Sequence, residues 1–576
     1  MKQRFYVLKN IKGYLYHIKW DIVILIFLSL ISLPITIVSP VFFQILVDDV
    51  MYQKEISKLL IVVVGMVGLF LLRFFLDGIS LKLNNRVHNS FVYLLRKDIF
   101  QKYKNSSYSF ISKKEVGELK MRIIDDVDII GNFISEHVVN YLYDVFMLIF
   151  TIVTSSMINW QMTLLCLLIL PVVFAVDTII GDGTKQINEE IRTVNSKYFT
   201  STHNSLQFWR EIKTQNLEEL FIERFCGFQN ILARLGVRSI SFWAYKEVFT
   251  DFKNNYLTKV LVYIIGAFFV MKQQISVGTL IMFSEYFSML FSSLESLNTK
   301  RISLKTNSPY YERIFDTFSF PEDERTTTSV KTLKKGIQLE NVKFSYLINS
   351  PVLKDINLQI NKGNYIAIVG KTGCGKTTLA RLLLGLYEKD EGKILFDDID
   401  ITQINRDDLY SLIGAVMQDS YLFNVTIREN LLIAKEDATV EDMIEACKKA
   451  NIYDFISQQP NGFDTIIGER GVKLSGGQKQ RISIAIVMLR DPQIVIFDEA
   501  TSSLDGQSEA VINDAIKKMS ENKTVIVIAH KPSTILKANK IIVMEEGRVT
   551  AQGTHEELIN NNKYYTKLME DVSSEK

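Results

Sequence analysis

The first half of the chain consists of long apolar segments separated by polar connections. A helix needs about 20 apolar residues to cross the hydrocarbon core of a bilayer. Six segments fit this requirement, some of them with one charged residue: 22–46, 56–76, 139–157, 160–180, 256–271 and 275–294. The pattern therefore predicts an α-helical membrane domain of six spans over residues 21–300.

The connections between these segments alternate in length. Those after the first, third and fifth segments are short, at 47–55, 158–159 and 272–274. Those after the second and fourth are long, carry many lysines and arginines, and have helical periodicity. Because positively charged connections stay in the cytosol, we expect the long ones to be cytosolic and to extend the spans well beyond the bilayer. This orientation predicts a multi-pass protein of the cytoplasmic membrane.

The N-terminal residues 1–20 place apolar side chains at helical spacing among basic residues. This composition is typical of a helix that lies on the membrane surface. The apolar run that follows is too long for a signal peptide and has no small-residue cleavage site, so we expect it to be retained as an anchor.

Charged residues inside a span cost roughly 2.5–3.5 kcal/mol each on insertion scales, so they require an explanation. The predicted spans contain Asp144, Asp177, Lys259 and Glu285. In the last span Glu285, Ser288 and Ser292 recur at helical spacing, which places them on one face. This face either lines a substrate cavity, where acidic groups favour a cationic substrate, or forms a packed seam in which Glu285 pairs with Lys259. The sequence leaves both interpretations open.

The second half of the chain has a different pattern. A polar stretch at 301–336, with prolines and a run of charged and threonine residues, predicts a linker. Over residues 337–576 strand-like runs alternate with helical ones, which is typical of an α/β domain. The expected fold is therefore a six-span helical membrane domain with long cytosolic helical extensions, followed by an α/β domain.

Composition supports this division into a membrane part and a soluble part. The 576 residues are 47% apolar with a net charge of only +2, and no basic block stands out. These features argue against nucleic-acid binding. The four cysteines have no paired spacing, which argues against a disulfide framework or a zinc site and fits a reducing cytosolic face.

A glycine-rich loop follows the strand-like run 365–369 and precedes a helical pattern. It consists of Gly370, Lys371, Thr372, Gly373, Cys374, Gly375, Lys376 and Thr377, with Thr378 next in the chain. Glycines let backbone N–H groups converge on a phosphate, and the start of a helix adds further donors. Lys376 is placed to reach the β- and γ-phosphates, and the Thr377 hydroxyl to bind Mg²⁺. The motif predicts binding of ATP with Mg²⁺.

A second strand-like run, at 494–497, ends in two carboxylates. Asp498 is placed to hold the Mg²⁺ through water. Glu499 is placed to polarise the water that attacks the γ-phosphate. Together with the glycine loop, this pair predicts hydrolysis of the bound nucleotide.

Between these motifs lie Ser475, Gly476, Gly477 and Gln478, which follow Leu474. This run matches the signature sequence of ATP-binding cassette (ABC) transporters. With six predicted spans in front, the chain resembles an exporter-type half-transporter of this family over nearly its whole length. The resemblance implies an ABC nucleotide-binding domain of the phosphate-loop type.

The resemblance also implies roles for residues that match the family's other motifs. Tyr346 falls where an aromatic ring stacks on adenine, and Gln418 where a glutamine senses Mg²⁺ and the transmembrane helices. His530 matches a histidine that contacts the γ-phosphate, and Asp505 lies in a segment that crosses between nucleotide domains. Residues 108–113 and 210–214 fall where coupling helices are found.

The family pattern implies a dimer, because the signature run completes the phosphate site of the opposite subunit. A homodimer is the simplest expectation, and a heterodimer stays open. ATP binding closes the dimer, and the spans alternate between inward- and outward-facing states to export a substrate through the lipid bilayer. The pattern of the first span and the overall layout resemble those of bacterial peptide exporters, which slightly favours a peptide substrate, with a multidrug or lipid exporter as the alternative. An ATP-gated channel or regulatory protein is a further alternative of a different class.

Overall fold

The computed structural model describes residues 12–168, 187, 190–191, 193–252, 256, 258–323, 328–347, 350–418, 421–468, 471–498, 506–529 and 531–574. The chain divides into two compact units. One consists of Met1–Gln101 and Val116–Ser319, and the other of Lys102–Glu115 and Phe320–Lys576. The first unit contains the predicted spans, and the second contains the α/β motifs together with a short piece of the first long connection.

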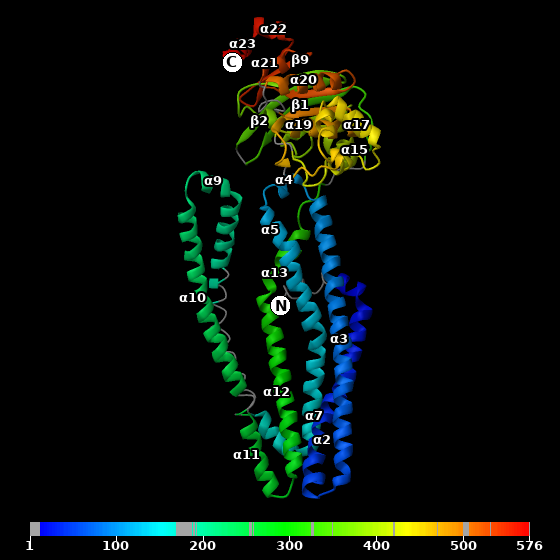
Figure 1. Ribbon diagram of the computed structural model, residues 1–576, viewed down its shortest axis with the longest axis vertical. Helices are drawn as coiled ribbons and strands as arrows, with labels where there is room; N and C mark the ends of the chain where they lie inside the picture. The colour runs from blue at the N-terminus through cyan, green and yellow to red at the C-terminus, as the bar shows by residue number, and fades with distance from the viewer. Residues whose placement is uncertain are drawn as a thin grey trace. The chain divides into compact units, whose positions relative to one another are not determined.

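The regular elements described in the first unit are all helices (Figure 1). Its elements in chain order are α2 (Lys19–Ile45), η1 (Leu46–Tyr52), α3 (Ile56–Asn105), α5 (Val116–Met121), η2 (Arg122–Asp126), α6 (Val127–Asn132), η3 (Phe133–Val138), α7 (Val139–Leu167), α9 (Trp209–Thr214), α10 (Glu218–Asp251), α11 (Thr258–Met271), α12 (Val277–Thr306) and α13 (Ser308–Phe318). The last residues of α3, from Lys102 onward, belong to the second unit.

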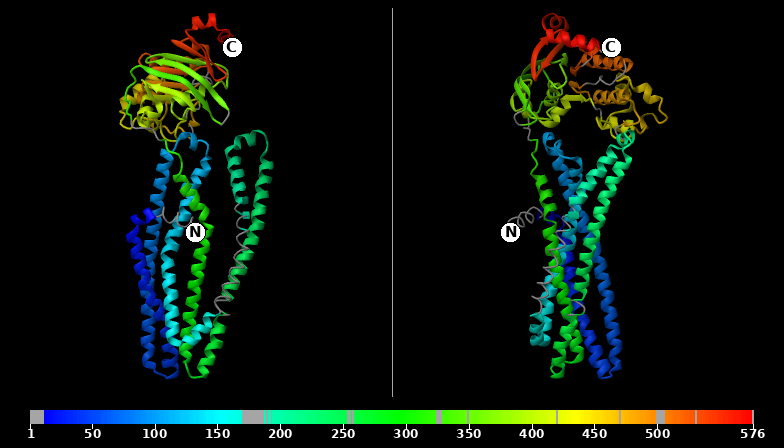
Figure 2. Two further views of the ribbon diagram at one scale, coloured as in Figure 1. Left: turned by 180° about the vertical axis from the view of Figure 1, so that it is seen from behind. Right: turned by 90° about the vertical axis from the view of Figure 1, so that its left-hand side faces the viewer.

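Helix α12 is the centre of the first unit. It packs against α7, α2 and α11, and Figure 2 shows α7 and α12 running alongside each other. Its core side chains Phe283 and Phe287 are fully buried, and their rings stack with centroids 6.2 Å apart. Met162 and Val262 bury their side chains in the same cluster. The apolar face of the last predicted span therefore meets other helices of the unit.

The lengths of the helices agree with the predicted spans and their extensions. Within the described residues, four helices are long and apolar enough to cross a membrane, and α11 is a shorter apolar helix. Helix α3 has 50 residues, which at 1.5 Å per residue is about 75 Å, far more than a bilayer core of about 30 Å. Of the predicted fourth span at 160–180, only the part up to Leu168 is described, and Asp177 lies outside the described residues.

The short connection predicted at 158–159 is confirmed. Asn159 has non-helical dihedral angles (φ −156°, ψ 103°) and interrupts α7. Its Oδ1 accepts a hydrogen bond from the Met162 N–H at 2.9 Å. An asparagine that accepts from the third residue of a new helix is a favourable N-cap, so this residue ends one predicted span and starts the next.

The connection predicted at 47–55 differs from a simple loop. The chain stays helical through η1, a π-helix that ends at Tyr52. In this segment Asp48 accepts a hydrogen bond from the Gly278 N–H at 2.9 Å and another from the Ser276 hydroxyl. Gln44 donates to the Thr279 hydroxyl at 2.9 Å. The extra turn therefore places a carboxylate on the unpaired N–H groups at the start of α12, a contact that local sequence does not reveal.

Gly278 permits this close approach. A Cβ atom added there would lie 2.6 Å from the Asp48 carboxylate and 2.7 Å from the Gln44 carbonyl oxygen. We expect Gly278→Ala to destabilise the protein by about 1–3 kcal/mol, because overpacking forces such contacts apart. The measurement is thermal unfolding in detergent. Gly68→Ala is the matched control, since a Cβ at Gly68 meets nothing within 4 Å. Equal stability of the two variants would contradict the prediction.

The described part of the predicted surface helix packs on α3. Residues 12–17 are helical, and residues 1–11 lie outside the described residues. The Tyr14 ring packs edge-on against Phe91, with centroids 5.8 Å apart, and its hydroxyl donates to Asp98 at 2.8 Å. This segment is therefore anchored to the unit by an aromatic side chain.

The residues predicted as a linker, 301–336, contain the end of α12 and the whole of α13. Buried charged groups hold α13 to the helices η2 and α6. Arg122 donates to the Arg313 carbonyl at 2.8 Å and to the Thr317 hydroxyl at 3.0 Å. Arg313 in turn donates to Asp126, which is only 1% exposed, at 2.7 Å. This network gives the C-terminal end of the first unit a fixed structure.

Within its described residues, the second unit has ten strands in two sheets. Its strands are β1 (Gly336–Ser345), β2 (Pro351–Asn361), β3 (Tyr365–Val369), β4 (Glu391–Phe396), β5 (Ile399–Asp400), β6 (Ile413–Val416), β7 (Ile494–Asp498), β8 (Thr524–Ile528), β9 (Lys540–Glu545) and β10 (Arg548–Gly553). One sheet is antiparallel, in the order β2-β1-β4-β5. The other has the order β10-β9-β3-β8-β7-β6 and is parallel except for β10.

The second unit also contains helices among its described residues. In chain order they are α4 (Tyr108–Ile111), α14 (Lys376–Leu383), η5 (Ile401–Gln403), α15 (Arg406–Leu412), α16 (Ile427–Leu432), α17 (Val440–Lys449), α18 (Tyr453–Ser457), η6 (Gly462–Asp464), α19 (Gly476–Arg490), α20 (Gly506–Ser520), α21 (Pro532–Ile535), α22 (His555–Asn561) and α23 (Lys563–Ser574). The α/β domain predicted from the alternating patterns is thus present.

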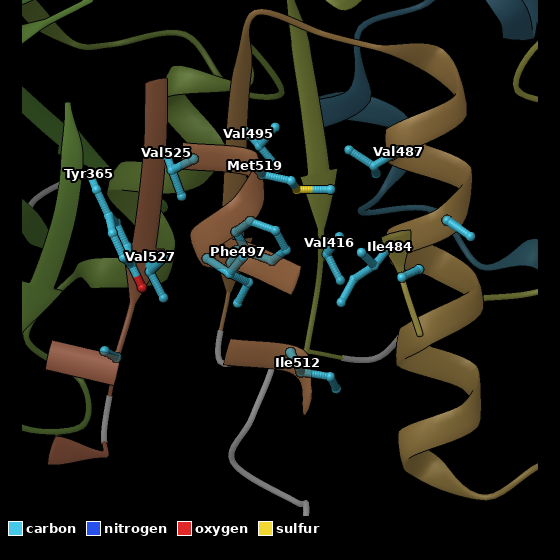
Figure 3. Close-up of a cluster of buried hydrophobic side chains, with 14 of the residues drawn as sticks. Tyr365, Val416, Ile484, Val487, Val495, Phe497, Ile512, Met519, Val525 and Val527 are labelled. Carbon is cyan, nitrogen blue, oxygen red and sulfur yellow. The ribbon is translucent and has the colours of Figure 1, made fainter. Parts of the chain in front are cut away.

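The core of this unit follows the two-residue period of its central strands. Along β7, Val495 and Phe497 enter one buried cluster, while Ile494 and Ile496 enter a second cluster on the opposite face. Figure 3 shows Val495 and Phe497 in the first cluster, together with Val416 of β6 and Ile484 of α19. Because both faces of a parallel sheet are covered, its strands read as continuous apolar runs. This explains why β3 and β7 were recognisable in the sequence.

Residues 102–115 belong to this unit and pack against the start of the segment that leads to β1. Tyr103 stacks on Phe320 with ring centroids 6.1 Å apart, and the Ser107 N–H donates to the Pro321 carbonyl at 3.0 Å. The segment contains α4, a short helix within the residues where the first coupling helix is expected. The second expected position, 210–214, falls in α9 of the first unit.

Candidate nucleotide site

The glycine loop and Asp498 lie at the same edge of the parallel sheet. In the strand register, Ile368 of β3 pairs with Ile528 of β8, and Ile528 pairs with Asp498 of β7. The loop begins one residue after β3 ends at Val369. The carboxyl edge of a parallel sheet is where such folds place their ligands, so the topology brings the two predicted motifs together.

Positive φ angles shape the loop. They occur at Gly370 (155°), Gly373 (84°) and Gly375 (104°). A Cβ atom on Gly370 would lie 2.2 Å from the Met544 carbonyl oxygen, whereas one on Gly373 would meet nothing within 4 Å. Gly370 is therefore required by packing, and Gly373 faces open space. Gly375 caps α14, whose first N–H groups are available to an anion.

Lys376 lies against the loop. Its side chain is buried, and Nζ donates to the Gly370 carbonyl at 2.8 Å and to the Lys371 carbonyl at 3.1 Å. The ammonium group therefore lies at the loop itself, where the positive charge and the helix dipole both favour phosphate. This arrangement fits the phosphates of a nucleotide.

Thr377 and Asp498 are in direct contact. The Thr377 hydroxyl donates to Asp498 Oδ1 at 3.1 Å, and Asp498 is only 3% exposed. A hydroxyl and a carboxylate are the oxygen ligands that Mg²⁺ prefers when it binds beside nucleotide phosphates. The two residues, 121 positions apart in the sequence, therefore fit the Mg²⁺ site that the sequence predicts.

Tyr346 is held by rings on one side and by hydrogen bonds on the other. Its ring packs edge-on against Phe344 and Tyr387, at centroid distances of 4.9 and 5.2 Å. Its hydroxyl donates to Thr378 and accepts from Arg381, both at 3.3 Å. The tyrosine predicted to stack on adenine is thus connected to α14, the helix that follows the loop.

The signature residues form the start of α19. Ser475 and Gln478 make reciprocal hydrogen bonds: the Ser475 hydroxyl accepts from the Gln478 N–H at 3.3 Å, and Gln478 accepts from the Ser475 N–H at 2.9 Å. This is a capping box. A Cβ on Gly476 would meet nothing within 4 Å, while Gly477 is buried. No hydrogen bond joins Ser475 to the glycine loop within the described part of the chain.

The structure describes only some of the remaining predicted site residues. Gln418 is exposed and lies two residues beyond the end of β6. Glu499, Asp505 and His530 lie outside the described residues. Their roles stay predictions from the sequence.

Two residues of this site had no recognisable motif. The Lys371 N–H donates to the hydroxyl of Tyr564, at the start of α23, at 3.2 Å. Tyr387 packs against Tyr346. Tyrosines in helices and loops are common in the chain, so neither had a local signal, and only the folded chain brings Tyr564 to the loop and Tyr387 to Tyr346.

The polar face of α12 in the first unit has mixed contacts. Glu285 lies 4.0 Å from Lys259, and their side chains are 41% and 33% exposed. The buried Ser288 hydroxyl has no hydrogen-bond partner among the described residues, and Ser292 is exposed. The Glu285–Lys259 pairing therefore exists at the limit of an ion pair, and both groups also reach solvent-accessible space. The substrate-cavity role of this face stays a prediction.

Asp144 has a partner that the sequence did not indicate. It forms an ion pair with Lys300 of α12, and both side chains are about nine-tenths buried. The charge predicted to need an explanation inside the third span is therefore neutralised by a lysine of α12.

Cys374 offers a chemical test of the loop. Its side chain is 7% exposed, and burial raises the pKa of the thiol. Because the thiolate is the reactive form, we expect N-ethylmaleimide to label Cys374 more slowly than the exposed Cys226. The labelling rate of Cys374 should still increase with pH at values where an ordinary thiol is already fully deprotonated. Labelling should inhibit ATP hydrolysis, and ATP should protect.

The test uses a variant that keeps only Cys374, with Cys166, Cys226 and Cys447 replaced by serine, and a matched variant with Cys374→Ala. Mass spectrometry measures the labelling, and phosphate release measures the activity. Full activity after complete labelling of Cys374 would contradict its placement in the nucleotide site.

Comparison with known proteins gives the same division of the chain. A sequence profile described as the ABC transporter transmembrane region matches residues 22–294, and one described as ABC transporter matches residues 353–502. The "Putative multidrug export ATP-binding/permease protein YgaD" of Bacillus subtilis is 30% identical over 98% of both chains. A protein of the same description from Staphylococcus aureus is 32% identical over 83% of this chain and 84% of its own.

A solved structure supports the fold independently. The structure of a bacterial Atm1-family ABC exporter with ATP bound superposes with a TM-score of 0.84 at 25% identity, and covers 96% of this chain and 98% of that one. The chain thus combines a multi-pass membrane domain with an ATP-hydrolysing domain whose activity is coupled to transport. Its phosphate loop, signature run, domain order and relatives all lead to one assignment: this chain belongs to the ABC transporter family.

Proposed function

We propose that this protein is a multidrug-type exporter that uses ATP to move amphipathic, cationic compounds out of the cytosol. The observation that carries the proposal is the joining, in one chain, of the glycine loop with its Thr377–Asp498 contact to a unit of long apolar helices. Relatives named as putative multidrug exporters, similar over nearly their full length, support the choice of substrate class. The transmembrane domain extends over residues 21–300 and the nucleotide-binding domain over residues 337–576.

The residues of the site have distinct roles in binding and hydrolysing ATP. The glycine loop and Lys376 bind the phosphates, and Tyr346 orients the adenine. Bound Mg²⁺ would be held by Thr377, Asp498 and Gln418, and would neutralise charge on the phosphates. Glu499 orients and deprotonates the attacking water, and His530 contacts the γ-phosphate. These assignments rest on the fit of the described residues and on the family motifs.

The working unit is a homodimer. One chain carries one glycine loop and one signature run, and Ser475 makes its described hydrogen bonds within its own helix cap. The open face at Gly476 leaves space for a phosphate of a second subunit. In such a dimer, ATP binds better to the closed arrangement than to the open one, so binding shifts the population and hydrolysis reverses it.

The substrate class follows from Glu285. Its side chain is 41% exposed and its distance to the Lys259 ammonium, 4.0 Å, is at the limit of an ion pair, so we expect the carboxylate to be available to a second cation. Neighbouring Ser288 and Ser292 add hydroxyl groups to the same face. A cationic compound with apolar surface suits this face better than an anionic one.

The test measures ATP hydrolysis and uptake in inside-out vesicles with a panel of lipophilic cations, cationic peptides and neutral lipids. We expect lipophilic cations to stimulate hydrolysis and to accumulate against a gradient. Glu285→Gln should reduce stimulation by cations, whereas Glu247→Gln, an exposed glutamate on α10, should not. If only peptides stimulate ATP hydrolysis, the substrate is a peptide and the proposed substrate class is wrong. Hydrolysis without accumulation of any compound would favour a gating or regulatory protein instead.

A further inference from the structure

Three tyrosine rings connect the candidate adenine site to the segment that joins α3 to α5. We call Tyr346, Tyr387 and Tyr108 the tyrosine chain. Tyr346 and Tyr387 pack edge-on with centroids 5.2 Å apart and an interplanar angle of 89°, and Tyr387 and Tyr108 pack edge-on at 5.6 Å and 85°. All three residues belong to the second unit. The ring of Tyr387 therefore contacts both of the others.

Tyr387 contributes its ring rather than its hydroxyl. The side chain is partly buried, and its ring also packs against Phe344 at 5.7 Å. Within the described residues its hydroxyl makes no hydrogen bond. By contrast, the Tyr346 hydroxyl bonds to Thr378 and Arg381 on α14. A phenylalanine could thus replace Tyr387 without loss of contact, which is not so for Tyr346.

The far end of the tyrosine chain is firmly held. Tyr108 is the first residue of α4. Within the same segment Phe110 packs against Phe320 with centroids 4.6 Å apart, and Lys102 pairs with Glu322 at 2.5 Å. The Arg406 side chain donates to the Lys104 carbonyl at 3.1 Å. A displacement of Tyr108 would therefore have to act against these contacts or be passed to Tyr387.

We propose that Tyr387 is a positioning residue that couples the orientation of Tyr346 to the position of α4. The inference rests on the proposed role of Tyr346 in stacking on adenine. When ATP holds the Tyr346 ring in place, the edge-on contacts hold Tyr387 and Tyr108 in turn. Coupling between two sites is reciprocal, so a displacement of α4 must also change the affinity for ATP.

The size of the effect follows from the strength of aromatic pairs. Edge-on pairs add free energy beyond the area that they bury. Loss of the two tyrosine contacts of Tyr387 is expected to weaken ATP binding by about tenfold. The effect should appear in the KM for ATP and in stimulation of hydrolysis by a transported compound. The turnover number without that compound should change less, because Tyr387 touches no reacting atom.

The experiment compares Tyr387→Leu with Tyr387→Phe in the full-length protein. It measures the Kd of MgATP by displacement of a fluorescent ATP analogue, the kinetic constants, and the thermal unfolding temperature. Tyr387→Leu should weaken ATP binding, and Tyr387→Phe should retain it. The matched control is Tyr453→Leu, a partly buried tyrosine of the same unit that packs against Phe463 and lies outside the tyrosine chain.

A double-mutant cycle with Tyr108→Leu tests the coupling itself. If the tyrosine chain couples the two ends, Tyr108→Leu should weaken ATP binding in the parent and have little further effect in Tyr387→Leu. Additive effects, or normal ATP affinity in Tyr387→Leu, would overturn the inference. Tyr346→Leu separates this result from the proposed site: if it also binds ATP normally, the adenine-stacking role of Tyr346 fails, whatever Tyr387 does.

Discussion

Replacement of Glu499 by glutamine is expected to slow ATP hydrolysis by about 10²- to 10⁴-fold, the usual contribution of a general base. Glutamine has the same shape as glutamate but cannot take a proton from the attacking water. Binding should persist, because the groups that contact the phosphates, the glycine loop and Lys376, are unchanged. The measurement combines phosphate release with the affinity for MgATP, and a dimer held closed by ATP is the expected product.

The control for this variant is Glu445→Gln. Glu445 is exposed on α17 and pairs with Lys449 across one helical turn, at 2.6 Å. This change should leave hydrolysis at the parent rate. If Glu499→Gln also hydrolyses ATP at the parent rate, Glu499 is not the residue that activates water.

Replacement of Asp144 by asparagine is expected to destabilise the first unit by about 3–5 kcal/mol, the usual cost of leaving one partner of a buried ion pair alone. Lys300 would keep its ammonium group, about nine-tenths buried between α7 and α12. Because α12 is the centre of the unit, the loss should loosen several helices together. The measurement is the fraction of monodisperse protein that remains in detergent after heating.

A double variant shows whether the charge is the cause. Replacing both residues with apolar ones, as Asp144→Leu with Lys300→Met, removes the unpaired charge and should recover most of the lost stability. The Glu445→Gln variant again serves as the control, since removal of one partner of an exposed pair costs about 0–1 kcal/mol. If Asp144→Asn is as stable as this control, the ion pair is not required for packing.

Much of the fold was predictable because its signals are local. The covered faces of the parallel sheet gave β3 and β7 continuous apolar runs, and Asn159 provided a break between two apolar segments. The connection at 47–55 was harder, because the helical turn at η1 is stabilised by Asp48 contacting the start of α12. A pattern of apolar and polar residues cannot report a contact of this kind.

The same difference between local and long-range signals applies to the candidate site. The glycines, Lys376 and Thr377 act within a few residues of one another, so their spacing alone predicted a phosphate loop. Asp498 was predicted from the end of a strand, and the structure supplied its contact with Thr377. Tyr387 and Tyr564 could not be found in this way, since Tyr387 contacts Tyr346 and Tyr564 contacts the loop from segments without a motif.

Residue type and short-range spacing were enough to predict which residues can bind and hydrolyse a nucleotide, which segments are long enough to cross a membrane, and which family the chain resembles. The folded chain was needed to show which distant groups meet: Asp144 with Lys300, Asp48 with Gly278, and Tyr108 with Tyr387. Periodicity indicates which face of an element is buried or polar, but the partner of that face depends on the packing of the whole chain.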